Sequence, residues 1–164
     1  MLCALVATFM LAAYFPYLTY GVPLASGVFV MFAVIEAGKR WALLTYAASA
    51  VIVFFFAEPE AKLIYLCFGG FYPILKALLE GLKNRVIEYI LKFAGFNAAV
   101  LIAYGVFAGL FGINIEQISD FGAYGIALLL LAANGVFILY DIALTRIAGF
   151  YMWKIHPFVR KFIK

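Results

Sequence analysis

The polar side chains that could do chemistry are few, because hydrophobic residues make up 68% of the 164 residues and charged residues only 12%. One set falls near a common level, at the ends of successive apolar segments, with a single amide placed deeper. Its members are Glu36, Lys76, Glu80, Asn97, Asp141 and Arg146, with Asn134 as the deeper amide. A carboxylate close to hydrocarbon is costly and needs a partner. Ion pairing is therefore the expected chemistry, with Lys76 and Arg146 as the available cations.

Two interpretations of this polar network stay open. It either moves or docks a cytoplasmic partner, or it is a static set of pairs at helix ends that fixes the bundle. Asn134 and Asp141 lie seven positions apart on one predicted helix and therefore share a face. For Asn134 the static interpretation means a hydrogen bond between two helices.

A second polar set lies in the turns at the opposite ends of the segments. Three tyrosines surround Pro16, and acids follow in two later turns. The candidate substrate-binding residues are Tyr14, Tyr17, Tyr20, Glu58 and Asp120. Aromatic rings with a few acids can line a small-molecule pocket that opens outward. The alternative is an interfacial aromatic belt beside solvated loop acids.

Small residues recur every four positions in the first segment, at Ala4, Thr8 and Ala12. Such a stripe lets another helix approach closely. It packs either against a helix of the same chain or against a separate subunit, and the second case would make it a docking face.

Catalysis has little support in the sequence. No HExxH, GxSxG or phosphate-binding loop motif occurs, and the lone His156 lies in a basic tail, away from any catalytic constellation. Cys3 and Cys67 lie far apart in apolar segments, so neither a disulfide framework nor a CxxC metal site is predicted. We therefore expect no enzyme, no metal and no cofactor.

Membrane-spanning helices must position these residues. Residues 1–35 contain no Asp, Glu, Lys, Arg or His, a composition foreign to water-soluble domains. A span takes about 20 residues, so this run, interrupted by Pro16, Gly21 and Pro23, predicts two short helices. A lipid-exposed segment must satisfy its own backbone hydrogen bonds, which favours helix throughout. The six predicted helices cover residues 2–15, 22–35, 41–57, 63–79, 89–113 and 122–142. The fourth should be the most distorted, because Gly69, Gly70 and Pro73 interrupt it.

Basic residues gather on one side of this six-helix path. Eleven of the twelve Lys and Arg residues fall in the second connection, around the fourth, or after the sixth segment. By the positive-inside rule this side is cytoplasmic. The sequence thus predicts an all-α integral membrane bundle of six transmembrane helices with both termini cytoplasmic. It forms a single domain, residues 1–164, in which 147–164 is a basic, aromatic cytoplasmic tail. The bilayer, rather than nucleic acid, then accounts for the net charge of +4.

These features resemble the substrate-binding S components of energy-coupling factor (ECF) transporters. The resemblance covers the short-looped six-helix topology, the small-residue stripe on helix one and the aromatic first outer turn. In that family an AxxxA-like patch on helix one contacts the coupling subunit, and the substrate pocket opens outward beneath the first outer loop. Here Thr8 replaces one alanine of the patch. Residues 34–39, 71–76 and 140–146 also resemble those of an uncharacterised bacterial membrane-protein family of similar length.

The resemblance implies a subunit of a bacterial inner membrane that binds a small solute or vitamin for uptake. Separate ATPases would supply energy through a coupling subunit docked on Ala4, Thr8 and Ala12. The alternative is a non-transport membrane scaffold that recruits a cytoplasmic partner through its basic face. A membrane enzyme ranks below both.

Overall fold

The computed structural model describes residues 1–15, 17–82, 84–110 and 122–157, and all of its regular elements within these ranges are helical. The α-helices are α1 (Leu2–Leu11), α2 (Gly21–Ala37), α3 (Lys39–Phe56), α4 (Pro59–Ile64), α5 (Tyr72–Leu79), α6 (Arg85–Leu110) and α8 (Gly122–Phe150). Three short helical elements extend or join them. One is a 3₁₀ turn, η1 (Ala12–Tyr14), and two are π turns, η2 (Tyr65–Gly69) and η3 (Tyr151–Ile155). The all-α prediction is confirmed.

Among the described residues, four helices are long and apolar enough to cross a membrane: Lys39–Phe56, Pro59–Leu79, Arg85–Ala103 and Leu130–Ile155. The two N-terminal apolar helices, Leu2–Tyr14 and Gly21–Ala37, are shorter, as the breakers in residues 1–35 predicted. The membrane character of the chain therefore rests on four helices that have the length a bilayer requires. The predicted tail begins as a continuation of α8, because helical structure runs through η3 to Ile155.

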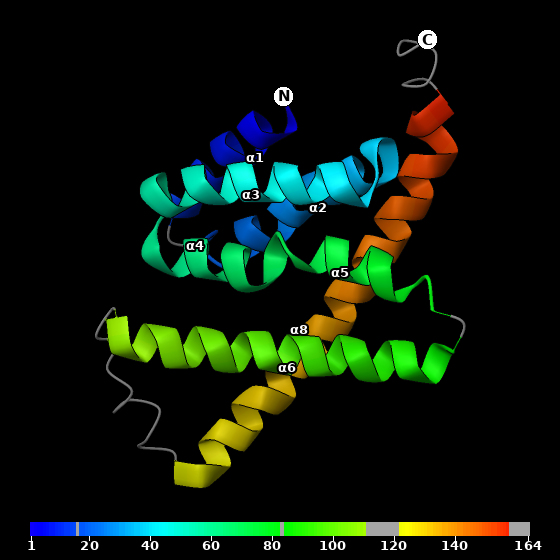
Figure 1. Cartoon of the computed structure of the whole chain (residues 1–164). Helices are drawn as coiled ribbons and strands as arrows, with labels where there is room; N and C mark the ends of the chain where they lie inside the picture. The colour runs from blue at the N-terminus through cyan, green and yellow to red at the C-terminus, as the bar shows by residue number, and fades with distance from the viewer. Residues whose placement is uncertain (16, 83, 111–121, 158–164) are drawn as a thin grey trace.

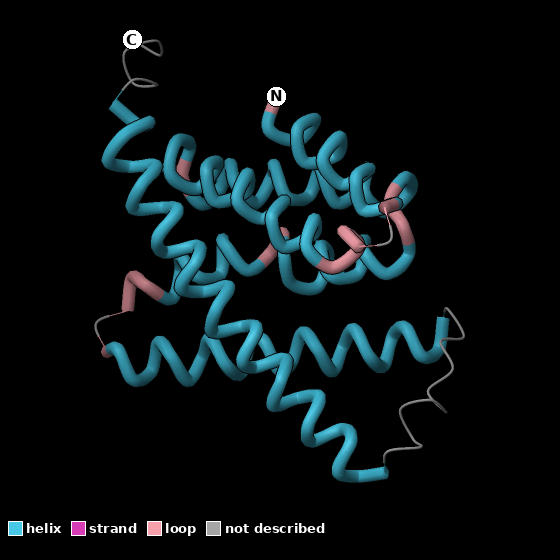
Figure 2. Tube along the Cα trace, turned by 180° about the vertical axis from the view of Figure 1, so that it is seen from behind, coloured by secondary structure: helices cyan, strands magenta, loops and turns pink. Residues whose placement is uncertain are grey.

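Most of the helices run side by side, whereas α8 crosses them obliquely (Figure 1). The central helix is α2, which packs against α1, α3, η2, α5 and α8. In contrast, α6 packs against η2, α5 and α8. Figure 2 shows the same crossing of α6 and α8 from behind.

The connections fall at two opposite ends of the bundle. In Figure 1 the α2–α3 and α5–α6 connections and the C-terminal end of α8 lie on the right. The start of α2, the α3–α4 connection and the C-terminal end of α6 lie on the left. The right-hand end carries Lys39, Arg40 and Arg85, and the left-hand end carries Glu58 and Glu60. Lys39, Arg40 and Arg85 thus lie at the end opposite Glu58 and Glu60, as the sequence predicted.

The fourth predicted helix is interrupted where the sequence places its breakers. A π turn at η2 ends at Gly69, and α5 begins anew at Tyr72 with Pro73 in its first turn, where proline is tolerated. Backbones approach closely here. A Cβ atom on Gly27 of α2 would overlap the carbonyl oxygen of Gly69, and one on Gly69 would lie 2.5 Å from the carbonyl oxygen of Pro23. Only glycine permits this packing of α2 against η2.

Tyr140 of α8 satisfies backbone groups at the same place. Its hydroxyl lies 3.0 Å from the Leu24 carbonyl oxygen and 3.3 Å from that of Gly69. Breaks in membrane helices are tolerated when neighbouring side chains satisfy the freed backbone groups. The distortion of η2 is therefore supported from both α2 and α8.

Candidate functional site

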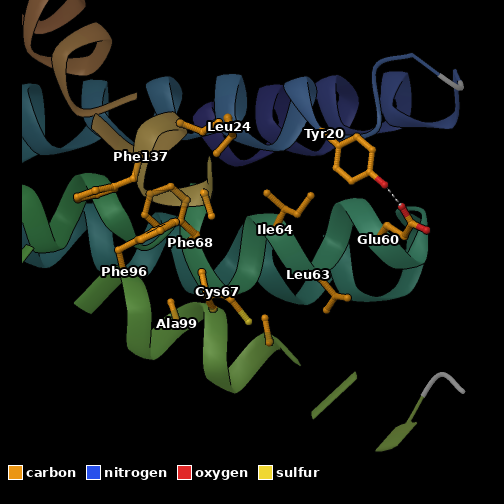
Figure 3. A pocket seen from close by; sticks show the side chains of 14 residues that line it. Tyr20, Leu24, Glu60, Leu63, Ile64, Cys67, Phe68, Phe96, Ala99 and Phe137 are labelled. Carbon is orange, nitrogen blue, oxygen red and sulfur yellow. Dashed lines mark hydrogen bonds between the residues drawn. The ribbon is translucent and has the colours of Figure 1, made fainter. Parts of the chain in front are cut away.

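A cavity of about 530 Å³ lies between α2, the α4–η2 segment, α6 and α8. It extends from Tyr20 and Glu60 at one end to Phe68, Phe96 and Phe137 at the other (Figure 3). The side chains between these ends are apolar or weakly polar: Leu24, Leu63, Ile64, Cys67, Ala99, Val100, Ala103, Ala133 and Val136. Small-molecule sites typically measure about 300 to 1,000 Å³, so the cavity can hold a vitamin-sized molecule.

The polar end of the cavity joins two of the predicted outer turns. The hydroxyl of Tyr20 donates a hydrogen bond to Glu60 Oε2 at 2.8 Å. This bond raises the pKa of Tyr20, because the neighbouring carboxylate holds the phenolic proton. Lys62 turns away and donates to the Phe54 carbonyl oxygen at 3.1 Å. Within the described part of the chain, no ion pair involves Glu58 or Glu60.

The opposite end of the cavity is a floor of aromatic rings. Phe68 and Phe96 meet edge to face at 5.0 Å between ring centroids, and Phe96 stacks on Phe137 at 4.7 Å. Phe68 also lies 5.0 Å from the ring of Tyr72, whose hydroxyl donates to Asp141 Oδ1 at 2.6 Å. Tyr72 thus connects the cavity floor to a charged layer below it.

That charged layer is a buried ionic cluster between α5, α6 and α8. Lys76 pairs with Asp141, and its Nζ lies 3.0 Å from Glu80 Oε1. Lys92 Nζ lies 2.8 Å from Glu88 Oε1, 3.4 Å from Glu80 Oε1 and 3.6 Å from Asp141 Oδ1. Except for Glu80 these residues are at most 9% exposed. Buried charges of this kind are tolerated only when they are paired.

The predicted polar network is thus divided into separate groups. Lys76, Glu80 and Asp141 come together, and Asn97 and Asn134 form a pair of their own on α6 and α8. Glu36 instead accepts a hydrogen bond from Tyr151 at 2.8 Å and lies 3.0 Å from His156 Nδ1. Among the described residues, no side-chain hydrogen bond connects one of these three groups to another.

Arg146 differs from expectation. We expected it to pair with Asp141, but it is exposed and makes no ion pair within the described ranges. The two residues are five positions apart on α8, which turns their side chains about 140° apart around the helix. Lys92 takes the place expected for Arg146, and Thr145 adds a hydroxyl 2.8 Å from Lys76 Nζ.

Of the candidate substrate-binding residues, Tyr20 lines the cavity. Tyr14 donates to the Phe56 carbonyl oxygen at 2.9 Å, and Tyr17 is 97% exposed. Glu58 is half-buried and is not among the lining residues, whereas Glu60, two positions later, is. Asp120 lies outside the described residues. The cavity therefore reaches the predicted outer turns, where Glu60 rather than Glu58 lines it.

The small-residue stripe on α1 faces outward. Ala4 and Thr8 are exposed, and Ala12 is half-buried against the core between α1, α2 and α3. The opposite face of α1 supplies the buried Val6 and Met10. Within the described chain, no helix covers Ala4 and Thr8, so internal packing does not account for them.

Sequence reasoning missed most of the lining residues, because they are apolar and look like ordinary helix-packing positions. Lys92 and Glu88 had a detectable signal, since they lie at i and i+4 on one helix.

No group of His, Cys, Asp or Glu able to hold a metal occurs among the described residues. Comparison with protein families, curated proteins and solved structures finds no match. What the arrangement can do chemically is hold a largely apolar molecule against an aromatic floor.

Proposed function

We propose that this chain is an S-component-like membrane subunit that binds a small solute for uptake and works with separate energising subunits. The observation that carries the proposal is the cavity between α2, α4–η2, α6 and α8, closed below by Phe68, Phe96 and Phe137. A solute carrier needs an internal site reached from one side, and this cavity begins at the acidic end of the bundle. The sequence carries no nucleotide-binding motif, so energy would come from other chains.

The proposed setting is a bacterial inner membrane crossed six times, with both termini in the cytoplasm. The two shorter helices, Leu2–Tyr14 and Gly21–Ala37, would complete the six spans. They are short for a lone span, but α2 is surrounded by neighbouring helices. The cavity mouth would then face the outside, and the ionic cluster would lie in the inner half of the bilayer.

The exposed stripe on α1 supports a docked partner. Ala4 and Thr8 are small, exposed residues on a helix that also exposes the larger side chains of Leu5 and Leu11. A second helix can approach such a surface closely. In this proposal the partner is the coupling subunit.

Affinity purification from the host membrane tests the proposal. The tagged chain should bring down a coupling subunit and transporter ATPases, and Ala4→Leu should remove them while the chain stays monodisperse. Ala48→Leu, at an exposed alanine on α3, is the matched control and should keep the partners. Purification without ATPases, or full retention by Ala4→Leu, would refute the docking role.

One observation favours the scaffold alternative. The basic end carries exposed Lys39, Arg40, Arg85, Arg146 and Lys154. Such a surface attracts anionic lipid or an acidic partner. A cytoplasmic protein in the same purification that is lost on Lys39→Gln/Arg40→Gln, rather than on Ala4→Leu, would favour this function.

A further inference from the structure

We propose that the cavity takes an apolar, ring-bearing molecule with a single protonated amine, held with the amine at Glu60 and the rings against Phe68 and Phe96. This ligand class rests on the proposed solute-binding function and goes beyond it. Three observations carry it: the composition of the walls, the shape of the floor and the charge at the mouth.

The walls exclude a solute with many polar groups. Of the fourteen lining residues, only Tyr20 and Glu60 offer strong hydrogen-bonding side chains, and both lie at one end. A solute with donors and acceptors along its length would leave most of them unpaired in the cavity, which is costly. The ligand therefore carries its polar atoms at one end only.

The floor favours flat rings. Phe68 and Phe96 meet edge to face, while Phe96 and Phe137 stack with 13° between their planes. Ala99, Ala103 and Ala133 line the space above them and keep it open. Aromatic rings prefer offset-stacked or edge-to-face neighbours, and this surface offers both kinds of contact to an entering ring.

The mouth favours a cation. Glu60 Oε2 accepts the Tyr20 hydroxyl, and Glu60 Oε1 accepts no hydrogen bond from the described residues. An ionised carboxylate is an acceptor only, so its ligand must donate. Glu58 adds a second negative charge two residues away. Lys62 donates to the Phe54 carbonyl oxygen and pairs with neither carboxylate. An anionic ligand would be repelled here, whereas a protonated amine can donate a hydrogen bond to Glu60 Oε1.

Binding to the protein in lipid nanodiscs tests the ligand class, with naphthylethylamine and naphthylethanol as matched probes. The two share a ring system, and only the amine is charged. The amine should bind about fivefold more tightly than the alcohol, as expected for an ion pair at an exposed carboxylate. Glu60→Gln should remove this difference. The same change at Glu36, a carboxylate near the far end of α2 that does not line the cavity, should leave it in place.

Filling the cavity gives the second arm of the experiment. Ala99→Phe should abolish binding of both probes, and Ala103→Leu serves if the first variant is not monodisperse. Equal affinities of amine and alcohol would refute the amine assignment. If neither probe binds but a polar solute co-purifies and is lost on Ala99→Phe, the ligand class is wrong and solute binding stands. If native mass spectrometry finds only phospholipid there, the ligand class and the proposed function both fail.

Discussion

Asn97 and Asn134 hold each other by two reciprocal hydrogen bonds, each 3.2 Å long, where α6 meets α8. Each amide also donates to a carbonyl oxygen four residues earlier on its own helix, Phe93 and Leu130 respectively, at 2.8 Å. Each amide group therefore donates once within the pair and once to its own helix, and each amide oxygen accepts one hydrogen bond from the partner. This geometry favours the static interpretation of Asn134, as a link between helices.

The first prediction is that Asn97 and Asn134 are energetically coupled. A double-mutant cycle of Asn97→Leu and Asn134→Leu should give a coupling free energy of about 0.6 kcal/mol and at most about 1.7 kcal/mol, the average and the largest value found for hydrogen bonds between membrane helices. Unfolding in mixed detergent micelles measures the four stabilities. Strictly additive losses would show that the two amides act separately.

The second prediction concerns the buried ionic cluster. Asp141→Leu removes the carboxylate that Lys76 and Lys92 share inside the bundle. Loss of one member of a buried pair costs about 3 to 5 kcal/mol, so the free energy of unfolding should fall by that order. Arg146→Leu, on the same helix but exposed, is the control and should change it by less than about 0.5 kcal/mol.

A pairing test separates lost charge balance from lost packing. Lys76→Met combined with Asp141→Leu should recover part of the stability lost in Asp141→Leu, because the uncompensated lysine is then gone. A double variant less stable than either single variant would contradict the pairing between Lys76 and Asp141.

The third prediction concerns the contact between α2 and η2. Gly27→Ala should destabilise the protein strongly, because the added methyl group would overlap the Gly69 carbonyl oxygen and the Tyr140 hydroxyl. Overpacking of this kind costs about 1 to 3 kcal/mol, or more where backbone must move. Gly135→Ala on α8 is the matched control, since no atom lies within 4 Å of its new Cβ. Equal melting temperatures for the two variants would contradict the close approach.

The fourth prediction is the topology. With Cys3 and Cys67 replaced by serine, a single cysteine at position 60 should react with a membrane-impermeant reagent in intact cells. A cysteine at position 85 should react only after permeabilisation, because the basic side is cytoplasmic by the positive-inside rule. The reverse pattern of labelling would overturn the orientation and place the cavity mouth inside.

Helix positions could be predicted from this sequence, because apolar runs and breakers report directly on the demands of lipid. The first miss was the start of one helix: α6 begins at Arg85, one turn before the expected residue 89. Glu88 then lies inside the helix and pairs with Lys92 across one turn, whereas the expected helix began after Glu88, and Lys92 was grouped with the basic residues around the connection. The four-residue error in this boundary thus left Glu88 and its pairing with Lys92 out of the predicted network.

The cavity could be predicted only at its polar rim. Tyr20 stands out in a cluster of tyrosines, but Phe68, Phe96 and Ala99 share their residue types with every buried helix face. Which apolar positions line a space depends on the π turn at η2 and on the oblique course of α8 (Figure 1). Neither feature has a periodic signal in a uniformly apolar segment. The choice of Glu60 over Glu58 follows from α4, which begins at Pro59 and turns successive side chains to different faces.

The last prediction concerns the hydrogen bond between Tyr20 and Glu60 and its dependence on pH. The pKa of Tyr20 is raised by that bond, above the value of about 10 for a free tyrosine. A raised pKa means that the bond contributes its full stability below about pH 10 and loses it as pH rises through the raised value. The melting temperature of the wild-type protein should therefore exceed that of Tyr20→Phe by a constant margin up to about pH 10 and converge with it above. Tyr17→Phe, at a side chain that is 97% exposed, should show no margin at any pH. A margin that does not fall as the Tyr20 hydroxyl ionises would mean that Tyr20 stabilises these turns by packing, and the cavity mouth would then have no hydrogen-bonded link to α4.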